Sequence, residues 1–415
     1  MNIVCIDLKS FYASVECVLR GVDPFHVPLV VSDLSRGKGA IVLAVSPKLK
    51  AMGVKSRCRI FDLPKDVDII YAKPRMKKYI EFASKIYDIY MQFVDPQDIH
   101  IYSIDEAFLD FTKYLKYYHK TDIELAKMVK TAIEEQTGLI ASCGVGENLF
   151  QAKVALDCLA KKDKDGIAAL NSNNFSKRVG NLKPITEIWG IGRGVGKRLA
   201  QRGITTLNEL AAYPVEALEK EFGILGKELS DHAKGVDSST IAEIKAYKPV
   251  SKSFGHGQVM LEDYRYQDMV VILQETIDEI VTELVTKKMC CQLIGLGIGY
   301  SMKIGGGFYR QKKLIAPTNS KKVLVEHFLQ LYYNNIQDKP IRSIHVRVGE
   351  LSYENYIQPD LFHDPALLNK EHEVYKAMAA IKEKYGKKSV NMAISYTEKA
   401  TKVKRSILIG GHNAE

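Results

Sequence analysis

The sequence of 415 residues contains one tryptophan and seven cysteines, and it lacks any Cys-x-x-Cys pair. Without such pairs, the usual spacing of a structural zinc site is absent. The cysteine number is odd and several cysteines stand in apolar surroundings, which favours reduced side chains and a cytoplasmic location. The seven are Cys5, Cys17, Cys58, Cys143, Cys158, Cys290 and Cys291.

Long apolar runs are also missing. The N-terminal apolar run is interrupted at Asp7, so it lacks the pattern of a signal peptide. No charge-free apolar stretch elsewhere reaches the length that a bilayer-spanning helix needs. We therefore expect no membrane partner.

The composition is that of a folded protein with several domains. Hydrophobic residues make up 46% and charged residues 26% of the chain. A chain of this length suits about two to four domains. The formal net charge of +10 suits a polyanionic partner, and nucleic acid is the leading candidate.

Two adjacent acids, Asp105 and Glu106, lie between β-forming runs at 99–102 and 107–111. Residues along a strand alternate between faces, but a turn can aim neighbouring side chains at one target. Adjacent carboxylates repel each other unless a cation lies between them, so the pair suggests a divalent-metal site. Asp7 ends another apolar run and is well placed to project into a cleft. The alternative is an ordinary polar hairpin turn.

Residues 1–170 predict an α+β unit in which helices cover one side of a largely antiparallel sheet. Ser10 is expected to cap the first helix, and a later helix is expected to bury Met76, Ile80 and Ile86. The expected strands are 2–7, 29–31, 40–45, a hairpin at 99–112, and 139–145. The expected helices are 11–19, 46–52, 75–93, 121–136 and 148–161.

A glycine-rich turn containing Gly190, Gly192 and Gly194 leads into one helix, and a second helix begins near Thr206. This order is the helix-hairpin-helix pattern. The amides of the turn and the N-terminus of the helix offer donors to a phosphate, with Lys197 nearby. The motif therefore predicts contact with a nucleic-acid backbone.

After a predicted linker at 236–252, a second α/β unit follows. Its expected helices are 267–288 and 321–332, and its expected strands are 293–300, 308–314 and 341–351. Basic residues fall on or beside these strands, which suits a nucleic-acid backbone, although a solvated sheet face is an equal alternative. The predicted DNA-binding residues of this unit are Lys303, Arg310, Lys312, Arg342 and Arg347.

Four blocks together resemble the Y-family DNA polymerases, in the UmuC-like branch (the ImpB/MucB/SamB family) and in a Gram-positive form. They are Asp7, Phe11-Tyr12, the block at 103–107 and the Gly190-Ile191-Gly192 turn. The resemblance implies a multidomain right-hand polymerase of α+β class. It assigns the palm to 1–17 and 75–180, the fingers to 18–74, the thumb to 181–240, a linker to 241–247, the little finger to 248–352 and a C-terminal extension to 353–415.

The resemblance implies two Mg²⁺ ions, with Mn²⁺ as an alternative, that serve transfer of a nucleotide from a dNTP to a primer 3′-hydroxyl. Carboxylate oxygens and substrate phosphates are the ligands that Mg²⁺ prefers. Asp7 and Asp105 would bridge both ions, and Glu106 would hold the ion near the primer terminus. The carbonyl of Leu8 would be a further ligand.

The same resemblance implies how the incoming nucleotide is held. Tyr12 takes the position of the steric gate that excludes a 2′-hydroxyl, and Phe11 would line the same pocket. Lys50 and Lys161 would contact the triphosphate. The match to Lys161 carries a one-residue offset after Lys153.

The peptide at 358–362 resembles the bacterial peptide that binds the β sliding clamp, through Gln358, Leu361 and Phe362. The implied partners are primer–template DNA, dNTP and the clamp, and the branch adds a UmuD-like subunit and a RecA filament. The expected activity is error-prone translesion synthesis within an SOS response. The alternatives are a non-catalytic scaffold bound to DNA and clamp in the damage response, and a dCMP-restricted transferase. Three metal-binding acids favour the enzyme.

Overall fold

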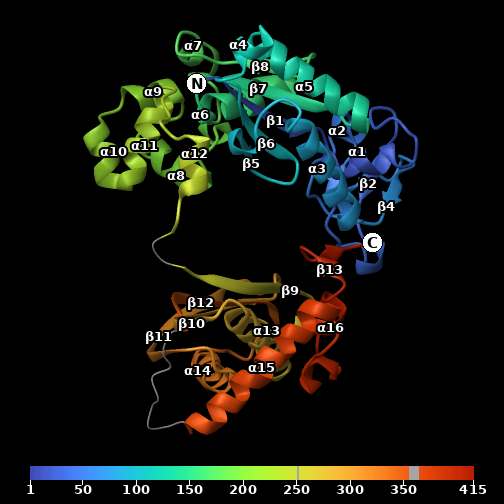
Figure 1. Ribbon diagram of the computed structural model, residues 1–415, viewed down its shortest axis with the longest axis vertical. Coiled ribbons are helices and arrows are strands. Elements are labelled where there is room, and N and C mark those ends of the chain that lie inside the picture. The colour runs from blue at the N-terminus through green and yellow to red at the C-terminus, as the bar shows by residue number, and fades with distance from the viewer. Residues whose placement is uncertain (250–251, 355–363) are drawn as a thin grey trace. The chain divides into compact units, whose positions relative to one another are not determined.

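The structure is a computed structural model, which describes residues 1–249, 252–354 and 364–415 (Figure 1). The chain forms two compact units. The first contains Met1–Tyr247 together with His412–Glu415, and the second contains Lys248–Gly411. None of the helices in the described ranges combines the length and the apolar character needed to cross a membrane.

The first unit is built around a five-stranded sheet of order β5-β6-β1-β7-β8, which is antiparallel except for the β7–β8 pair. The central strand β1 is buried along most of its length because it has a neighbour on each side and helices above and below. The strands are β1 (Ile3–Leu8), β5 (Ile99–Ile101), β6 (Glu106–Asp110), β7 (Ala141–Gly146) and β8 (Ile167–Ala169).

Helices cover both faces of this sheet, so the expectation of a one-sided cover is wrong. On one face the thiol of Cys143 reaches the Ala126 carbonyl of α5 at 3.8 Å. The opposite face receives α6, which approaches the backbone at Gly144. The helices of this region are α1 (Phe11–Val18), α3 (Met76–Tyr90), α4 (Leu115–Tyr118), α5 (Asp122–Thr137), α6 (Leu149–Val154) and α7 (Phe175–Val179).

Local sequence explains most of the helix ends. Thr121 and Glu124 form a capping box at the start of α5, and Gly138 ends this helix with a φ of 71°. The prediction that Ser10 caps the first helix is wrong. Ser10 adopts a left-handed conformation (φ 53°), and its side chain makes no capping hydrogen bond. A residue that caps a helix through its side chain is typically in the β region instead.

Residues 18–74 contain a small three-stranded sheet of order β3-β2-β4. The predicted strand at 40–45 is shorter than expected, since only its last two residues form β3. The elements are β2 (Leu29–Val31), β3 (Ala44–Val45), α2 (Pro47–Ala51) and β4 (Ile70–Ala72). Ser46 caps α2 by accepting a hydrogen bond from the amide of Leu49.

Residues 193–246 form a group of short helices (Figure 1). The core of this group includes Leu199, Leu207 and Leu229. The predicted linker at 241–247 requires correction, because α12 forms within it. Ile241 is buried there and fixes the helix to the first unit. The helices are α8 (Arg193–Ala200), α9 (Leu207–Ala212), α10 (Val215–Phe222), α11 (Ile224–Ala233) and α12 (Ile241–Ala246).

The second unit has a four-stranded antiparallel sheet of order β11-β10-β12-β9, whose apolar face packs against α13 and α14. Strand β9 was not predicted. The strands of this sheet are β9 (Phe254–Tyr264), β10 (Met289–Tyr300), β11 (Gly307–Thr318) and β12 (Ile341–Tyr353). The short strand β13 (Leu408–Ile409) belongs to the second unit but not to this sheet. The helices are α13 (Tyr266–Thr286), α14 (Lys321–Tyr333), α15 (Pro365–Tyr385) and α16 (Lys402–Arg405). The short strand β14 (His412–Asn413) belongs to the first unit.

The predicted C-terminal extension is largely part of the second unit. Buried Asp278 on α13 accepts a hydrogen bond from the Tyr375 hydroxyl of α15 at 2.5 Å and also pairs with Lys402 of α16. Glu275 accepts from the amides of Thr401 and Lys402 at 2.8 and 3.1 Å. These carboxylates hold both C-terminal helices against α13.

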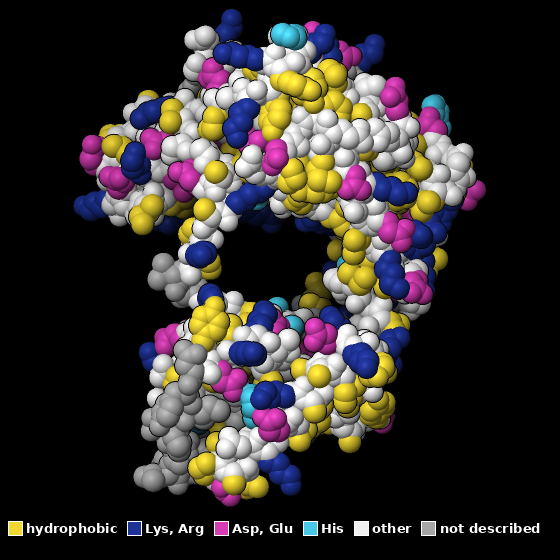
Figure 2. All heavy atoms as spheres, in the orientation of Figure 1, with side chains coloured by type: hydrophobic (Ala, Val, Ile, Leu, Met, Phe, Trp, Pro, Cys, Tyr) yellow, Lys and Arg dark blue, Asp and Glu magenta, His cyan; other side chains and the backbone are white. Residues whose placement is uncertain are grey.

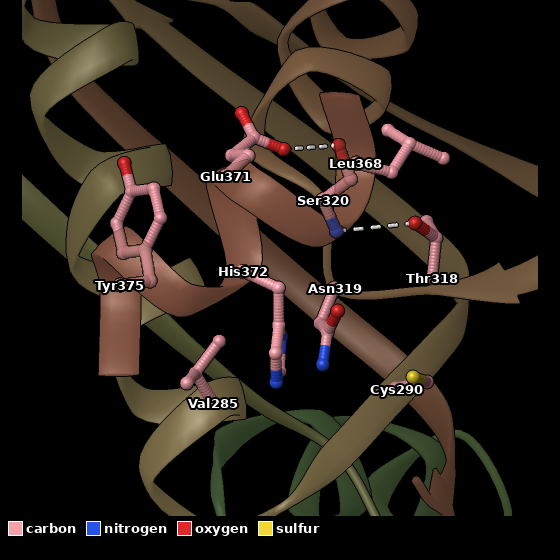
Figure 3. Close-up of a pocket in the computed structure, with 9 residues that line it drawn as sticks. All are labelled: Val285, Cys290, Thr318, Asn319, Ser320, Leu368, Glu371, His372 and Tyr375. Atoms are coloured by element: carbon pink, nitrogen blue, oxygen red, sulfur yellow. Dashed lines mark hydrogen bonds between the residues drawn. The ribbon is translucent and has the colours of Figure 1, made fainter. Parts of the chain in front are cut away.

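A small cavity lies where α15 packs on this unit (Figure 3). Beside it, Glu371 of α15 accepts from the hydroxyl of Ser320 at 2.5 Å and from the amide of Lys322 at 3.1 Å, which fixes α15 to the start of α14. The cavity volume of about 20 Å³ leaves room for roughly one water molecule. It is therefore too small for a nucleotide.

Gly144 offers a test of how closely α6 must approach the sheet. A Cβ at this position would lie 2.2 Å from the Ala152 carbonyl oxygen and 2.3 Å from the Leu156 amide. We expect Gly144→Ala to cost about 1–3 kcal/mol, because backbone cannot move aside as a side chain can. Urea unfolding followed by the fluorescence of Trp189 measures this. The matched control is Gly39→Ala, where a Cβ meets nothing within 4 Å. Equal stability of the two variants would contradict the argument.

Candidate active site

The three predicted acids meet at one end of the β1–β6 pair. Asp7 and Glu106 are direct cross-strand partners, so their side chains point to the same face. Asp105 lies in the bend just before β6, where its carbonyl accepts from the Leu8 amide at 3.0 Å. The Ser103 hydroxyl donates to the Asp105 carboxylate at 2.6 Å. The bend thus places adjacent acids beside Asp7, as the sequence predicted.

Two lysines from the helical segment that covers this face, Lys153 and Lys161, pair with the acids. Glu106 is buried and lies 2.5 Å from the ammonium of Lys153, which is also buried. Lys153 lies 3.0 Å from Asp157, and Asp157 lies 2.8 Å from Lys161. Lys161 in turn lies 3.1 Å from Asp7. Charges therefore alternate in sign from Glu106 to Asp7.

The environment of these groups shifts their proton affinities. Burial raises the pKa of Asp7 to about 6, against the opposing charge of Lys161. Burial opposes the charged form of Lys161, but Asp7 and Asp157 outweigh it and raise the pKa of Lys161. Cys5 is buried against Glu106, with its thiol 3.2 Å from the carboxylate, and burial followed by that charge raises the pKa of Cys5. The lysines are therefore charged at neutral pH, and the Cys5 thiol is protonated.

The chain between Lys153 and Lys161 departs from a regular α-helix. After α6 the chain forms a π-helical turn at Ala155–Leu159 and then a short 3₁₀ turn at Ala160–Lys162. In a π turn the backbone hydrogen bond spans one more residue than in an α-helix. Lys161 lies in the 3₁₀ turn and reaches Asp7 at 3.1 Å.

The side chains of the acids do not form a closed metal cage. In the described part of the chain, no three Asp, Glu, His or Cys side chains are gathered closely enough to hold a metal ion. Glu106 is directed to Lys153 and Asp7 to Lys161. The donor set still fits Mg²⁺, since all the predicted ligands are oxygens and this ion commonly uses one or two carboxylates together with substrate phosphates and water.

Tyr12 is held by a set of contacts that the sequence did not reveal. Its ring stacks on that of Tyr79 at 4.4 Å with an interplanar angle of 19°. Tyr79 is buried and donates its hydroxyl to Glu16 at 2.9 Å, and Glu16 also receives Arg75 at 2.7 Å. Phe11 is buried 5.6 Å from the Tyr12 ring. Tyr12 thus rests on a rigid base.

The prediction of which residues α3 buries was wrong at one position. Ile80 was expected to be buried but is 46% exposed, whereas Tyr79 is fully covered. The spacing of Met76, Tyr79 and Ile86 fits a helical face equally well. Tyr79 can be buried on this face because its hydroxyl donates to the buried carboxylate of Glu16.

Lys50 of α2 lies within electrostatic range of the acids. Desolvation lowers the pKa of Lys50, while the charges of Asp7 and Asp105 oppose the shift. The side chain is exposed and therefore accessible to a ligand. The structure brings Lys50 and Lys161 toward the same carboxylate, Asp7.

The glycine-rich turn leads directly into α8. Gly190 has a φ of 87°, and Gly192 is the N-terminal boundary residue of α8. A Cβ at Gly190, Gly192 or Gly194 would meet nothing within 4 Å, and Lys197 is exposed on α8. The phosphate contact at this turn stays a prediction.

The predicted basic residues of the second unit do not share one face. Arg310 lies 3.1 Å from Asn335, and Lys312 lies 2.6 Å from Gln330, so both reach the helical side of the sheet. Arg347 contacts Ser253 at 2.8 Å. The remaining two are Arg342, which pairs with Asp263 at 3.1 Å, and Lys303, which is exposed.

Basic and acidic side chains are interspersed on the visible face of each unit in Figure 2. On this face the net positive charge is not gathered into a single patch.

Comparisons with known proteins agree with this architecture. Residues 6–157 match the impB/mucB/samB family, 251–361 match its C-terminal domain, and 186–237 match the DNA polymerase-iota thumb domain. In Bacillus subtilis (strain 168), "Putative UV-damage repair protein UvrX" is 35% identical over 100% of this chain and 98% of its own. "DNA polymerase IV 2" of the same organism is 32% identical over 99% and 98%.

A solved Y-family DNA polymerase chimera has a TM-score of 0.67 and 23% identity, over 85% of this chain and 100% of its own. The fold is therefore that of a Y-family polymerase, with an α+β right-hand architecture, a helical thumb and a C-terminal little finger. The chain belongs to the impB/mucB/samB family, the UmuC-like branch of the Y-family DNA polymerases.

Sequence reasoning missed Lys153, Asp157, Tyr79 and Glu16. A signal existed for the first two, because Lys153, Asp157 and Lys161 recur every four residues with alternating charge, as residues on one helix face do. Glu16 and Tyr79 meet over a separation of 63 residues, which no local pattern reveals.

The buried ion pair beneath the site yields a stability prediction. Lys153→Met leaves Glu106 buried without its cation, and we expect a loss of about 3–5 kcal/mol. Urea unfolding followed by Trp189 fluorescence measures the loss. The control is the double variant Lys153→Met with Glu106→Gln, which should recover part of it because no uncompensated charge is left. A double variant less stable than Lys153→Met would contradict the pairing.

Proposed function

We propose that the protein is a DNA-directed DNA polymerase that transfers a nucleotide from a dNTP to a primer 3′-hydroxyl during error-prone translesion synthesis. The observation that carries the proposal is the cross-strand pair of Asp7 and Glu106 with Asp105 in the adjoining bend. A scaffold would have no physical need for three acids at one end of a sheet.

Asp7, Asp105, Glu106 and the Leu8 carbonyl would hold two Mg²⁺ ions, or Mn²⁺ in their place. When bound, these ions would lower the pKa of the attacking hydroxyl and offset charge on the leaving pyrophosphate. The chain itself prepares the site by giving two of the acids a lysine partner each. Lys153 compensates Glu106 from below, and Lys161 compensates Asp7.

Lys50 and Lys161 would bind the triphosphate through charge-assisted hydrogen bonds. Lys161 already pairs with Asp7, so a bound triphosphate would compete for its ammonium. Tyr12 would lie beneath the sugar and exclude a 2′-hydroxyl, with Phe11 alongside. Stacking on buried Tyr79 supports this assignment, since a steric gate must not yield.

Primer–template DNA would contact the thumb at the turn formed by Gly190, Gly192 and Gly194. Main-chain donors and exposed Lys197 can bind a phosphate there without reading sequence. In the little finger, Lys303, Arg342 and Arg347 remain proposed contacts. To reach DNA, Arg310 would have to leave Asn335, which follows α14, and Lys312 would have to leave Gln330 of α14.

The clamp-binding residues Gln358, Leu361 and Phe362 lie outside the described residues, and their role is proposed from the sequence alone. The same holds for a UmuD-like subunit, a RecA filament, SOS control and a cytoplasmic location.

Removing one acid should separate chemistry from binding. We expect Asp105→Ala to lower primer extension by about two to three orders of magnitude or more, the scale found when transition-state charge loses its stabilising group. Affinity for primer–template, measured by fluorescence anisotropy, should stay near the wild-type value. Asp110→Asn, at the far end of β6 and outside the site, is the matched control. Normal extension by Asp105→Ala would exclude this site and favour the scaffold.

The steric gate gives an independent test. Tyr12→Ala should raise incorporation of ribonucleotides relative to deoxyribonucleotides by about 10- to 100-fold, the range that steric discrimination in a pocket supplies. Single-nucleotide incorporation with paired dNTP and rNTP measures the ratio. Tyr12→Phe retains the ring and should keep the wild-type discrimination. An unchanged ratio in Tyr12→Ala would remove Tyr12 from this role.

A further inference from the structure

The single tryptophan of the chain lies between the thumb turn and the catalytic hairpin. Trp189 directly precedes Gly190, the first glycine of the turn. Its indole Nε1–H donates to the hydroxyl of Tyr102 at 3.1 Å, and the two rings meet edge to face at 6.1 Å and 79°. Tyr102 in turn lies three residues before Asp105.

Trp189 is fixed on its thumb side. Its ring packs 6.3 Å from that of Phe150, which stacks on His232 at 4.1 Å with an interplanar angle of 12°. Phe150 and Phe175 belong to the apolar core that the thumb helices share. A displacement of Gly190 would therefore move the indole, or work against this core.

Tyr102 is fixed on its palm side. Its amide donates to the Glu106 carbonyl at 3.0 Å, which closes the hairpin around Asp105. The ammonium of Lys153 lies 5.5 Å from the centre of the Tyr102 ring while it pairs with Glu106. The Tyr102 ring thus contacts the same lysine that holds the catalytic glutamate.

The Trp189–Tyr102 hydrogen bond is not needed to satisfy buried groups. Tyr102 is 46% exposed, so water could replace either partner at little cost. The hydrogen bond is instead directional, and it joins two elements that are each rigidly held. Such a link constrains orientation more than it stabilises the fold.

We propose that Trp189 and Tyr102 are positioning residues that couple the thumb turn to the catalytic hairpin. DNA phosphate bound at the turn would set the orientation of Asp105 and Glu106 through this link. The inference rests on the proposed polymerase function and adds to it a route by which correct duplex seating favours chemistry.

The test uses Trp189→Phe and Tyr102→Phe, which keep an aromatic ring and remove the donor or the acceptor. We expect each to slow single-turnover nucleotide incorporation by about threefold to tenfold, the effect of one hydrogen bond on an activation barrier. The Kd for primer–template should change by less than about twofold. The double variant should be no slower than either single one, because both remove the same interaction.

Binding is followed independently of activity. Without metal or dNTP, primer–template should change the emission of Trp189 equally in the wild type and in Tyr102→Phe, since the turn adjoins the indole. Tyr117→Phe, which removes an exposed hydroxyl of the same unit, is the matched control and should behave as the wild type. This measurement separates loss of coupling from loss of binding.

Three outcomes would overturn the inference. Unchanged incorporation by both variants would leave the hydrogen bond without a role. Additive slowing in the double variant would mean that the two residues act separately. If the affinity for primer–template falls by the same factor as the incorporation rate, Trp189 is a binding residue only. If the wild type fails to extend primers, the proposed function falls and this inference with it, whereas an active wild type with indifferent variants removes this inference alone.

Discussion

The buried pair of Glu106 and Lys153 is the contact on which the candidate site depends. Two acids next to each other, with a third on the neighbouring strand, would repel one another at the end of a largely buried sheet. Lys153 lies beneath Glu106, and Asp157 and Lys161 continue the alternation of charge to Asp7. Lys153 so placed gives the Glu106 carboxylate a buried ion-pair partner at 2.5 Å. The acids are therefore held in place before any metal or nucleotide binds.

This arrangement requires the helix to lie directly on the sheet. Gly144 and Gly146 face α6, and a Cβ on either would approach backbone atoms to 2.3 Å or less. Their absence of side chains allows Lys153 to pass under Glu106. After α6 the chain passes through a π-helical turn, and Lys161 beyond it pairs with Asp7. The small residues of the strand and the helical segment that covers them thus serve the same electrostatic arrangement.

The sequence predicted the parts of this site that are local. Asp105 and Glu106 were predicted because adjacent carboxylates repel each other unless a cation lies between them, and α5 was predicted because Thr121 and Gly138 mark its ends. Tyr79 was missed because its partner Glu16 is distant in the chain, and β9 because its exposed residues give little apolar alternation. The helix within the predicted linker was missed for a similar reason. Only Ile241 is buried there, and a single buried residue makes no periodic pattern.

The difference between local patterns and long-range contacts also explains why the sequence predicted the thumb turn and the hairpin around Asp105 but not the contact between them. The glycines of the turn and the acids of the hairpin each have a local signature, whereas Trp189 and Tyr102 are separated by 87 residues and each looks like an ordinary aromatic residue. Their contact depends on α6, which packs against the sheet on one side and the thumb helices on the other. Phe150 and Lys153 both belong to α6, so one element supports both the indole and the lysine that pairs with Glu106. A shift of this helix would therefore be felt at the thumb turn and at Glu106 together.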